Sequence, residues 1–188
     1  AGMLSDYERV LPEHGAVLLV CNHVSLMDPV ILMGAVRRPT RFVMYYKIFD
    51  IPLMKWLFKA ARAIPIAGRK EDPVLMERAF AEVDRVLAAG EIVGIFPEGG
   101  ITRDGQLLPC RPGVERILAA RAVPVVPMAL RGMWGSLFSR KDRLRLPRKF
   151  RSRIAPALGD PIPAELATAE SLEQRVPELR GAWAQRVR

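Results

Sequence analysis

Short apolar segments alternate with helical ones along most of this 188-residue chain, and this alternation restricts the fold more than any other feature. Residues 16–21 are apolar throughout and stop at polar Asn22, which is typical of a buried strand. Strands that alternate with helices predict an α/β sandwich in one domain, with a central, largely parallel sheet flanked by helices. The other predicted strands cover residues 41–45, 63–66, 92–96, 123–130 and 153–158.

The clearest predicted helix begins at Asp72 and Pro73. Asp72 suits the N-cap, Pro73 suits the first helical position, and Gly90 lies where a C-cap glycine belongs. Its apolar positions share one face, namely Leu75, Met76, Ala79, Val83, Val86 and Leu87. Other helices are predicted over residues 29–36, 48–62, 112–122 and 164–186, the last with a break at Pro177.

The length suits one domain over residues 1–188, and its start beside the first strand leads us to expect a piece of a longer protein. Two cysteines, Cys21 and Cys110, make neither a disulfide framework nor a zinc set. We therefore expect no metal and a reducing compartment. Because no apolar run reaches 18 residues, we expect no transmembrane helix.

His23 and Asp28 follow the first predicted strand and could form a general base and its orienting carboxylate. On one regular helix, five residues would leave the two side chains about 140° apart, so a bend between them is required. Asp28 precedes Pro29, and a residue before proline avoids the α region. The alternatives are an N-cap role for Asp28 and a purely structural histidine at a strand end.

Two further segments follow predicted strands, where ligands bind in open α/β sheets. Arg69 comes just after Gly68, and its guanidinium could hold a phosphate through two hydrogen bonds or lie solvated on the surface. Residues 96–99 read Phe-Pro-Glu-Gly; Glu98 could accept from a hydroxyl, steady a basic side chain or be an ordinary turn acid. Gly99 and Gly100 leave backbone amides open to a ligand.

Together these segments, and Val-Pro-Val-Val-Pro at residues 123–127, resemble four ordered blocks of the PlsC-type acyltransferases, which acylate glycerol phosphates and lysophospholipids. The resemblance implies the PlsC-like fold and an O-acyltransferase with His23 as base, held by Asp28. The acyl group would pass from acyl-CoA or acyl carrier protein to a lysophospholipid or acylglycerol-phosphate hydroxyl, without a cofactor. Predicted substrate-binding residues are Asn22, Ser25, Arg69, Glu98, Gly99, Gly100 and Arg103.

Arg103 departs from the family pattern, in which Phe-Pro-Glu-Gly is followed by Thr or Ser and then Arg. Here Gly100-Ile101-Thr102 comes before Arg103, so the arginine lies two positions later. Residues 96–105, 111–113 and 131–136 are more similar to the bacterial branch that reacylates 2-acylglycerophosphoethanolamine. The block at residues 123–127 contains prolines inside a predicted strand, which indicates a sheet edge or a bulge. We expect it to shape an acyl channel.

The net charge of +9 indicates an acidic partner: nucleic acid, an anionic membrane or an acidic carrier protein. Residues 139–153 hold eight basic residues and one acid, Asp142, which suits an anionic bilayer or a solvated loop. Residues 48–62 suit an interfacial helix or a core helix with a solvated stripe. We expect peripheral attachment at the cytoplasmic face of a membrane, through Lys55, Lys59, Arg143, Arg145, Arg148 and Lys149.

Three other functions compete with this one. A basic lipid- or nucleic-acid-binding module explains the charge but not the ordered blocks, and 7% aromatic residues leave few stacking platforms for nucleic acid. A serine hydrolase could use Ser25, yet the chain contains no Gly-x-Ser-x-Gly elbow. A pseudoenzyme would bind lipid without reacting. We expect an enzyme that has no nucleic-acid partner.

Overall fold

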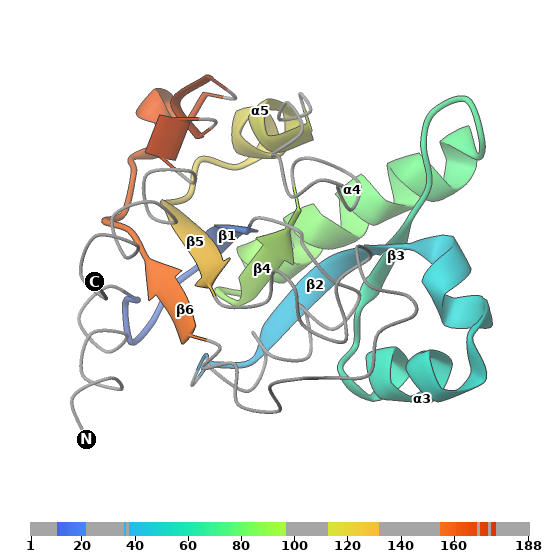
Figure 1. Cartoon of the computed structure of the whole chain (residues 1–188). Coiled ribbons are helices and arrows are strands. Elements are labelled where there is room, and N and C mark those ends of the chain that lie inside the picture. Colours follow the sequence, from blue (N-terminus) through green and yellow to red (C-terminus); the bar gives the residue numbers. More distant parts are fainter. Residues whose placement is uncertain are drawn as a thin grey trace.

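One six-stranded sheet forms the centre of the protein (Figure 1). The computed structural model describes residues 11–21, 36, 38–96, 113–131, 155–168, 170–172 and 174–175. The strands are β1 (Val17–Cys21), β2 (Thr40–Tyr45), β3 (Ile64–Ile66), β4 (Ile92–Ile95), β5 (Val125–Arg131) and β6 (Ala155–Leu158). The named helical segments are η1 (Tyr46–Asp50), α3 (Pro52–Ala60), α4 (Pro73–Ala88), α5 (Gly113–Ala120) and η2 (Ala164–Leu166).

The strand order is β3-β2-β4-β1-β5-β6. The first five strands along the chain pair in parallel, and β6 pairs antiparallel with β5. Each predicted strand is present, with its ends moved by at most two residues. The prediction of an α/β fold with a largely parallel sheet is therefore confirmed.

Both faces of the sheet are covered, and β1 explains why its sequence is apolar throughout. All five of its residues are buried. Leu18 and Val20 join the core formed with α4 and α5, whereas Val17 and Leu19 join the core formed with α3. A strand buried on both faces cannot show the polar alternation of a half-exposed strand.

Gly94 in β4 allows an aromatic ring to lie directly on the strand. A Cβ atom at this position would lie 2.3 Å from the Phe42 ring, too close for any side chain. Phe42 in turn stacks on Phe96 with ring centroids 5.6 Å apart. The glycine therefore lets two aromatic rings pack where β4 reaches its carboxyl end.

Helix α4 has the predicted ends. The Asp72 side chain accepts a hydrogen bond of 2.9 Å from the Leu75 amide, and Pro73 is the first helical residue. Gly90 has a positive φ of 76° just beyond the C-cap, the conformation that favours glycine. The predicted apolar face packs on the sheet, with Ala79 and Val83 among its buried residues.

The predicted single helix over residues 48–62 is wrong in one respect. A 3-10 segment, η1, and an α-helix, α3, replace it, with Ile51 extended between them at ψ 116°. The reason is Pro52, which disfavours the α conformation in the residue before it. Helix α5 agrees with the helix predicted over residues 112–122. At the start of the helix predicted over residues 164–186 the structure has the 3-10 turn η2. Of the helix predicted over residues 29–36, residues 29–35 lie outside the described residues.

Pro127 lies in an interior strand beside a bulge. β5 is flanked by β1 and β6, so the segment is not at an edge. Val125 pairs with Ile162 and Met128 with Leu158, so three steps along β5 face four steps along its partner. The extra residue opposite Pro127 interrupts the ladder where proline has no amide hydrogen to donate. Of the two predicted alternatives, the structure has the bulge.

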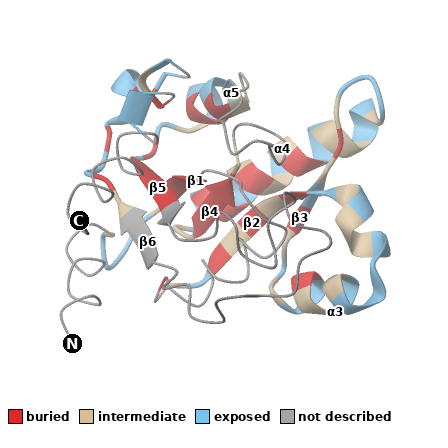
Figure 2. Cartoon of the chain, in the orientation of Figure 1, coloured by how far each residue is buried: buried red, intermediate tan, exposed pale blue. Residues whose placement is uncertain are grey.

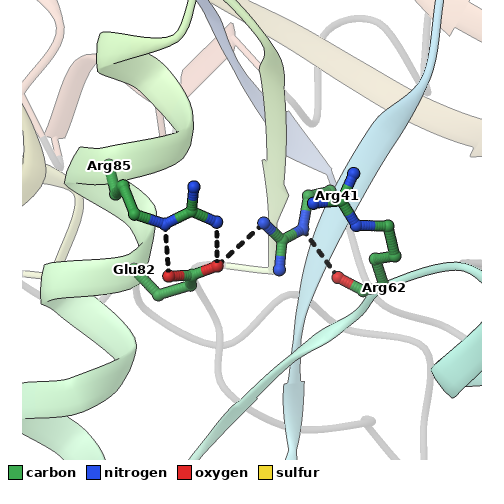
Figure 3. Close-up of polar contacts among 4 residues, drawn as sticks. All are labelled: Arg41, Arg62, Glu82 and Arg85. Carbon is green, nitrogen blue, oxygen red and sulfur yellow. Dashed lines mark hydrogen bonds and ion pairs between the residues drawn. The ribbon is translucent and has the colours of Figure 1, made fainter.

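A charged network fixes α4 against β2 (Figure 3). Glu82 on α4 accepts from Arg85 at 2.6 and 2.8 Å and from Arg41 on β2 at 2.8 Å. Arg41 also donates to the backbone oxygen of Arg62 at 2.8 Å, and Arg62 has a left-handed φ of 55°. The network therefore joins the helix, the strand and the turn after α3.

Candidate functional site

The carboxyl ends of β1 and β4 are neighbours at one edge of the sheet. Val20 pairs with Ile95, so Cys21 and Phe96 each lie one residue further along adjacent parallel strands. On its other side Cys21 pairs with Met128 of β5. The chain thus leaves the middle of the sheet at Cys21, in the place where open α/β sheets bind their ligands.

Most of the predicted site residues lie outside the described residues, so their geometry stays a prediction. In the sequence His23 comes two residues after Cys21, and Glu98 two residues after Phe96. The undescribed site residues are His23, Asp28, Asn22, Ser25, Glu98, Gly99, Gly100, Arg103, Arg143, Arg145, Arg148 and Lys149.

Arg69 is exposed in the turn between β3 and α4. The Gly68 carbonyl shapes this turn by accepting from the amides of Glu71 and Asp72, both at 3.0 Å. Within the described residues Arg69 has no hydrogen-bond or ion-pair partner. The hydrogen bond from Arg116 lowers the pKa of Glu77, and the charge of Arg69 adds to this effect, but Glu77 is already paired with Arg116. Among the described residues, therefore, no partner competes with an anion for the guanidinium of Arg69.

A cluster of four side chains, which the sequence reasoning missed, ties this turn to the end of β2. Tyr45 Oη lies 2.7 and 2.9 Å from the two carboxylate oxygens of Glu71, and Tyr46 donates to the same carboxylate at 2.9 Å. Lys47 Nζ completes the cluster at 3.2 Å. The available signal was that Tyr-Tyr-Lys begins at the end of one predicted strand and that Glu71 comes after the next, since both strands end at the same edge of the sheet.

These contacts set the charge of the cluster. Hydrogen bonds from Tyr45 and then Tyr46 lower the pKa of Glu71. The hydrogen bond with Glu71, followed by the contact with Tyr45, raises the pKa of Lys47 to about 12. At neutral pH the carboxylate and the ammonium therefore offset each other. The positive charge that the turn offers a ligand comes from Arg69 and Lys70, both of which are exposed.

The site residues that the structure describes do not all lie together. Arg69 follows β3, an edge strand separated from β1 by β2 and β4. Three strand spacings of about 4.8 Å place β3 roughly 14 Å from β1 along the sheet. Lys55 and Lys59 are exposed on α3, on the face of the sheet opposite α4 and α5. Among the described residues no helix is long and apolar enough to cross a bilayer.

Comparison with known proteins connects this chain with acyltransferases. A model of the family described as "Acyltransferase" matches residues 5–131. The 1-acyl-sn-glycerol-3-phosphate acyltransferase of Cocos nucifera is 31% identical over 130 residues, covering 69% of this chain and 41% of that protein. The Bacillus subtilis enzyme of the same name is 26% identical over 182 residues, which cover 90% of this chain and 83% of that protein.

A third relative, the chloroplastic enzyme BAT2 of Brassica napus, is 31% identical over 113 residues, which are 60% of this chain and 32% of that protein. The chain thus spans between a third and a half of the first curated relatives it matches. Among solved structures, the lysophosphatidate acyltransferase PlsC of Thermotoga maritima has a TM-score of 0.68 at 21% identity. That match covers 96% of this chain and 69% of PlsC, and it supports the fold.

Proposed function

Because the chain belongs to the acyltransferase family, we propose that it moves a fatty acyl group from an acyl thioester to the hydroxyl of a 1-acylglycerol phosphate or lysophospholipid. The observation that carries the proposal is the pairing of β1 with β4. It supports the proposal because β1 and β4 end side by side, at the edge where open α/β sheets bind their ligands.

In the proposed reaction His23 takes the proton of the acceptor hydroxyl as the oxygen attacks the thioester carbonyl. The new C–O bond forms, the C–S bond breaks, and the thiolate leaves with a proton returned by the imidazolium. Asp28 orients the imidazole and stabilises its positive charge during the transfer. Both thioester and ester are acyl compounds at the same oxidation level, so the chemistry needs only a base and an oriented acceptor.

Arg69 is proposed to hold the phosphate of the acceptor. Its exposed guanidinium, unpaired among the described residues, and the neighbouring Lys70 give the turn a positive charge. In this proposal the arginine side chain and the glycerol backbone of the acceptor together span the lateral separation of about 14 Å between β3 and β1. The acceptor is proposed to contact Glu98, Asn22, Ser25 and Arg103. The reacting carbonyl is proposed to contact the backbone amides of Gly99 and Gly100.

The donor is proposed to be acyl-CoA or acyl carrier protein, and the acceptor to lie in an anionic membrane at its cytoplasmic face. The named relatives are 1-acylglycerol-3-phosphate acyltransferases, which favours a phosphate-bearing acceptor. The 2-acylglycerophosphoethanolamine acceptor remains a prediction.

One assay tests the proposal directly. The purified chain is incubated with isotope-labelled acyl-CoA or acyl carrier protein and a panel of lysolipids, and the products are identified by mass. We expect labelled diacyl lipid and one equivalent of free thiol for each ester formed. Thiol release without ester would indicate a thioesterase instead. If neither product forms, while the folded protein binds lipid vesicles or duplex DNA, the binding-module alternative holds.

A further inference from the structure

Helix α3 turns two large apolar side chains away from the core. Leu53 is 69% exposed and Trp56 is 71% exposed. They are three positions apart and so share one face of the helix. Phe58, in contrast, is fully buried and packs against Phe49 with ring centroids 6.1 Å apart. The apolar residues of this segment therefore divide between the core and the outside, and α3 has both buried and exposed parts (Figure 2).

Basic residues accompany the exposed apolar pair. Lys55 and Lys59 are exposed, and neither has an ion-pair partner among the described residues. From Tyr46 to Arg62 the chain has four basic residues and one acid, Asp50. Core packing leaves the lysines and the apolar pair without an explanation, since Phe58 already anchors the helix. An external surface that is both apolar and negatively charged would match them.

We propose that this face of α3, defined by Leu53, Lys55, Trp56 and Lys59, inserts into the surface of an anionic lipid bilayer. Leucine and tryptophan enter the boundary of the acyl chains, while the lysine stems lie along them and the ammonium groups stay among the phosphates. Tryptophan suits this depth because its ring is apolar and its N–H is polar. The choice of a bilayer rests on the proposed function, in which the acceptor is a membrane lipid.

Helix α3 is connected through β2 to the turn that holds Arg69. β2 ends at Tyr45, and α3 begins seven residues later, after η1. The same strand end is hydrogen-bonded to Glu71, two residues beyond Arg69. The chain thus connects α3, through η1 and the end of β2, to the turn that holds Arg69.

The test compares two surface variants of the chain. In Leu53→Glu/Trp56→Glu the exposed pair is replaced by charge. In the control, Leu166→Glu replaces a leucine that is 62% exposed in η2, which follows β6 in the chain and is remote in sequence from α3. Binding is measured by sedimentation with vesicles of phosphatidylcholine with and without phosphatidylglycerol. We expect the affinity of the double variant for anionic vesicles to be lower than that of wild type by about tenfold or more. The affinity of the control should stay within twofold of wild type.

Two companion variants separate the forces. Leu53→Ser/Trp56→Ser removes apolar surface without adding charge and should also weaken binding. Lys55→Gln/Lys59→Gln should weaken binding only when phosphatidylglycerol is present, and raising the salt from 0.1 to 1 M should abolish this difference. Circular dichroism is used to check that each variant is folded. A folded double variant that binds like wild type overturns the proposal.

Other occupants of this face give different results. If wild type sediments as a dimer and the double variant as a monomer, while vesicle binding is unchanged, the face contacts a second copy and the proposal is wrong. The same holds if only binding to acyl carrier protein falls. Transfer to a short-chain, water-soluble acceptor tests the proposed function separately. Its absence from wild type would contradict that function and leave the vesicle result standing.

Discussion

Tyr45, the last residue of β2, and Glu71, in the turn after β3, are joined by a hydrogen bond of 2.7 Å. Two strands are parallel neighbours here, so the bond ties their carboxyl ends together. Arg69 is two residues before Glu71 in the same turn. We therefore regard Glu71 as a positioning residue that limits where the guanidinium of Arg69 can lie.

Replacing Glu71 by Gln should raise KM for the lysolipid several-fold, with little change in KM for the thioester. The substitution removes the charge that attracts Lys47 and weakens the bonds from Tyr45 and Tyr46. Because the pKa of Glu71 is lowered, this effect should be present above its ordinary range near 4.5 and fade as the pH falls below it. Equal changes in both KM values would indicate general damage to the protein.

His23→Ala should lower turnover by ~10²–10⁴-fold, the usual contribution of a general base. His14→Ala is the matched control, because the chain has only these two histidines and His14 is exposed before β1. The wild-type rate should rise with pH through about 6.5, or higher if Asp28 stabilises the imidazolium. A folded His23→Ala protein with full activity would rule out this mechanism.

Asp28→Asn should lower turnover by about 10²-fold or more while leaving the melting temperature nearly unchanged. Asparagine caps helices about as well as aspartate, so if Asp28 were only a cap the variant would keep both its turnover and its melting temperature. Asp72→Asn is the control, since Asp72 is an observed N-cap that accepts from Leu75 at 2.9 Å. Full activity in Asp28→Asn would return Asp28 to a structural role.

Arg69→Lys keeps a positive charge but loses the two-pronged hydrogen bonding to phosphate. KM for a phosphate-bearing lysolipid should therefore rise more than KM for the thioester. Arg78→Lys, an exposed arginine on α4, should change neither. If the two substrates are affected alike by Arg69→Lys, the turn does not hold the acceptor phosphate.

The Glu82 network predicts an acid-sensitive contribution to stability. Hydrogen bonds from Arg85 and then Arg41 lower the pKa of Glu82 to about 2. A depressed folded-state pKa stabilises the protein above the unfolded value of about 4.5, and this stabilisation is lost as the pH falls toward 2. Urea midpoints at pH 7 and pH 3 should therefore differ less for Glu82→Gln than for wild type. Glu165→Gln, on exposed η2, should retain the wild-type difference.

The strands and the clearest helix could be predicted from the sequence because their signals are local. An apolar run at residues 16–21 has no polar face to show to solvent and is short, which indicates a buried strand, and β1 is one. Asp72, Pro73 and Gly90 act within one turn of the helix ends that they define. The ordered blocks likewise identified the family, since they are strings of adjacent residues and the family match spans residues 5–131.

Only the tertiary structure decided features that depend on what packs against what. The sequence left residues 48–62 as either an interfacial helix or a core helix, yet in the structure Phe58 is buried against Phe49 whereas Trp56 is exposed. No local rule brings Glu71 to Tyr45, 26 residues away, because the contact depends on β2 and β3 pairing in parallel. The sequence by itself determined which segments become strands and helices and which family the chain belongs to, because those properties depend on adjacent residues. The sheet order decided which strand ends meet and which side of α3 remains exposed, because these depend on contacts between segments that are far apart in the chain.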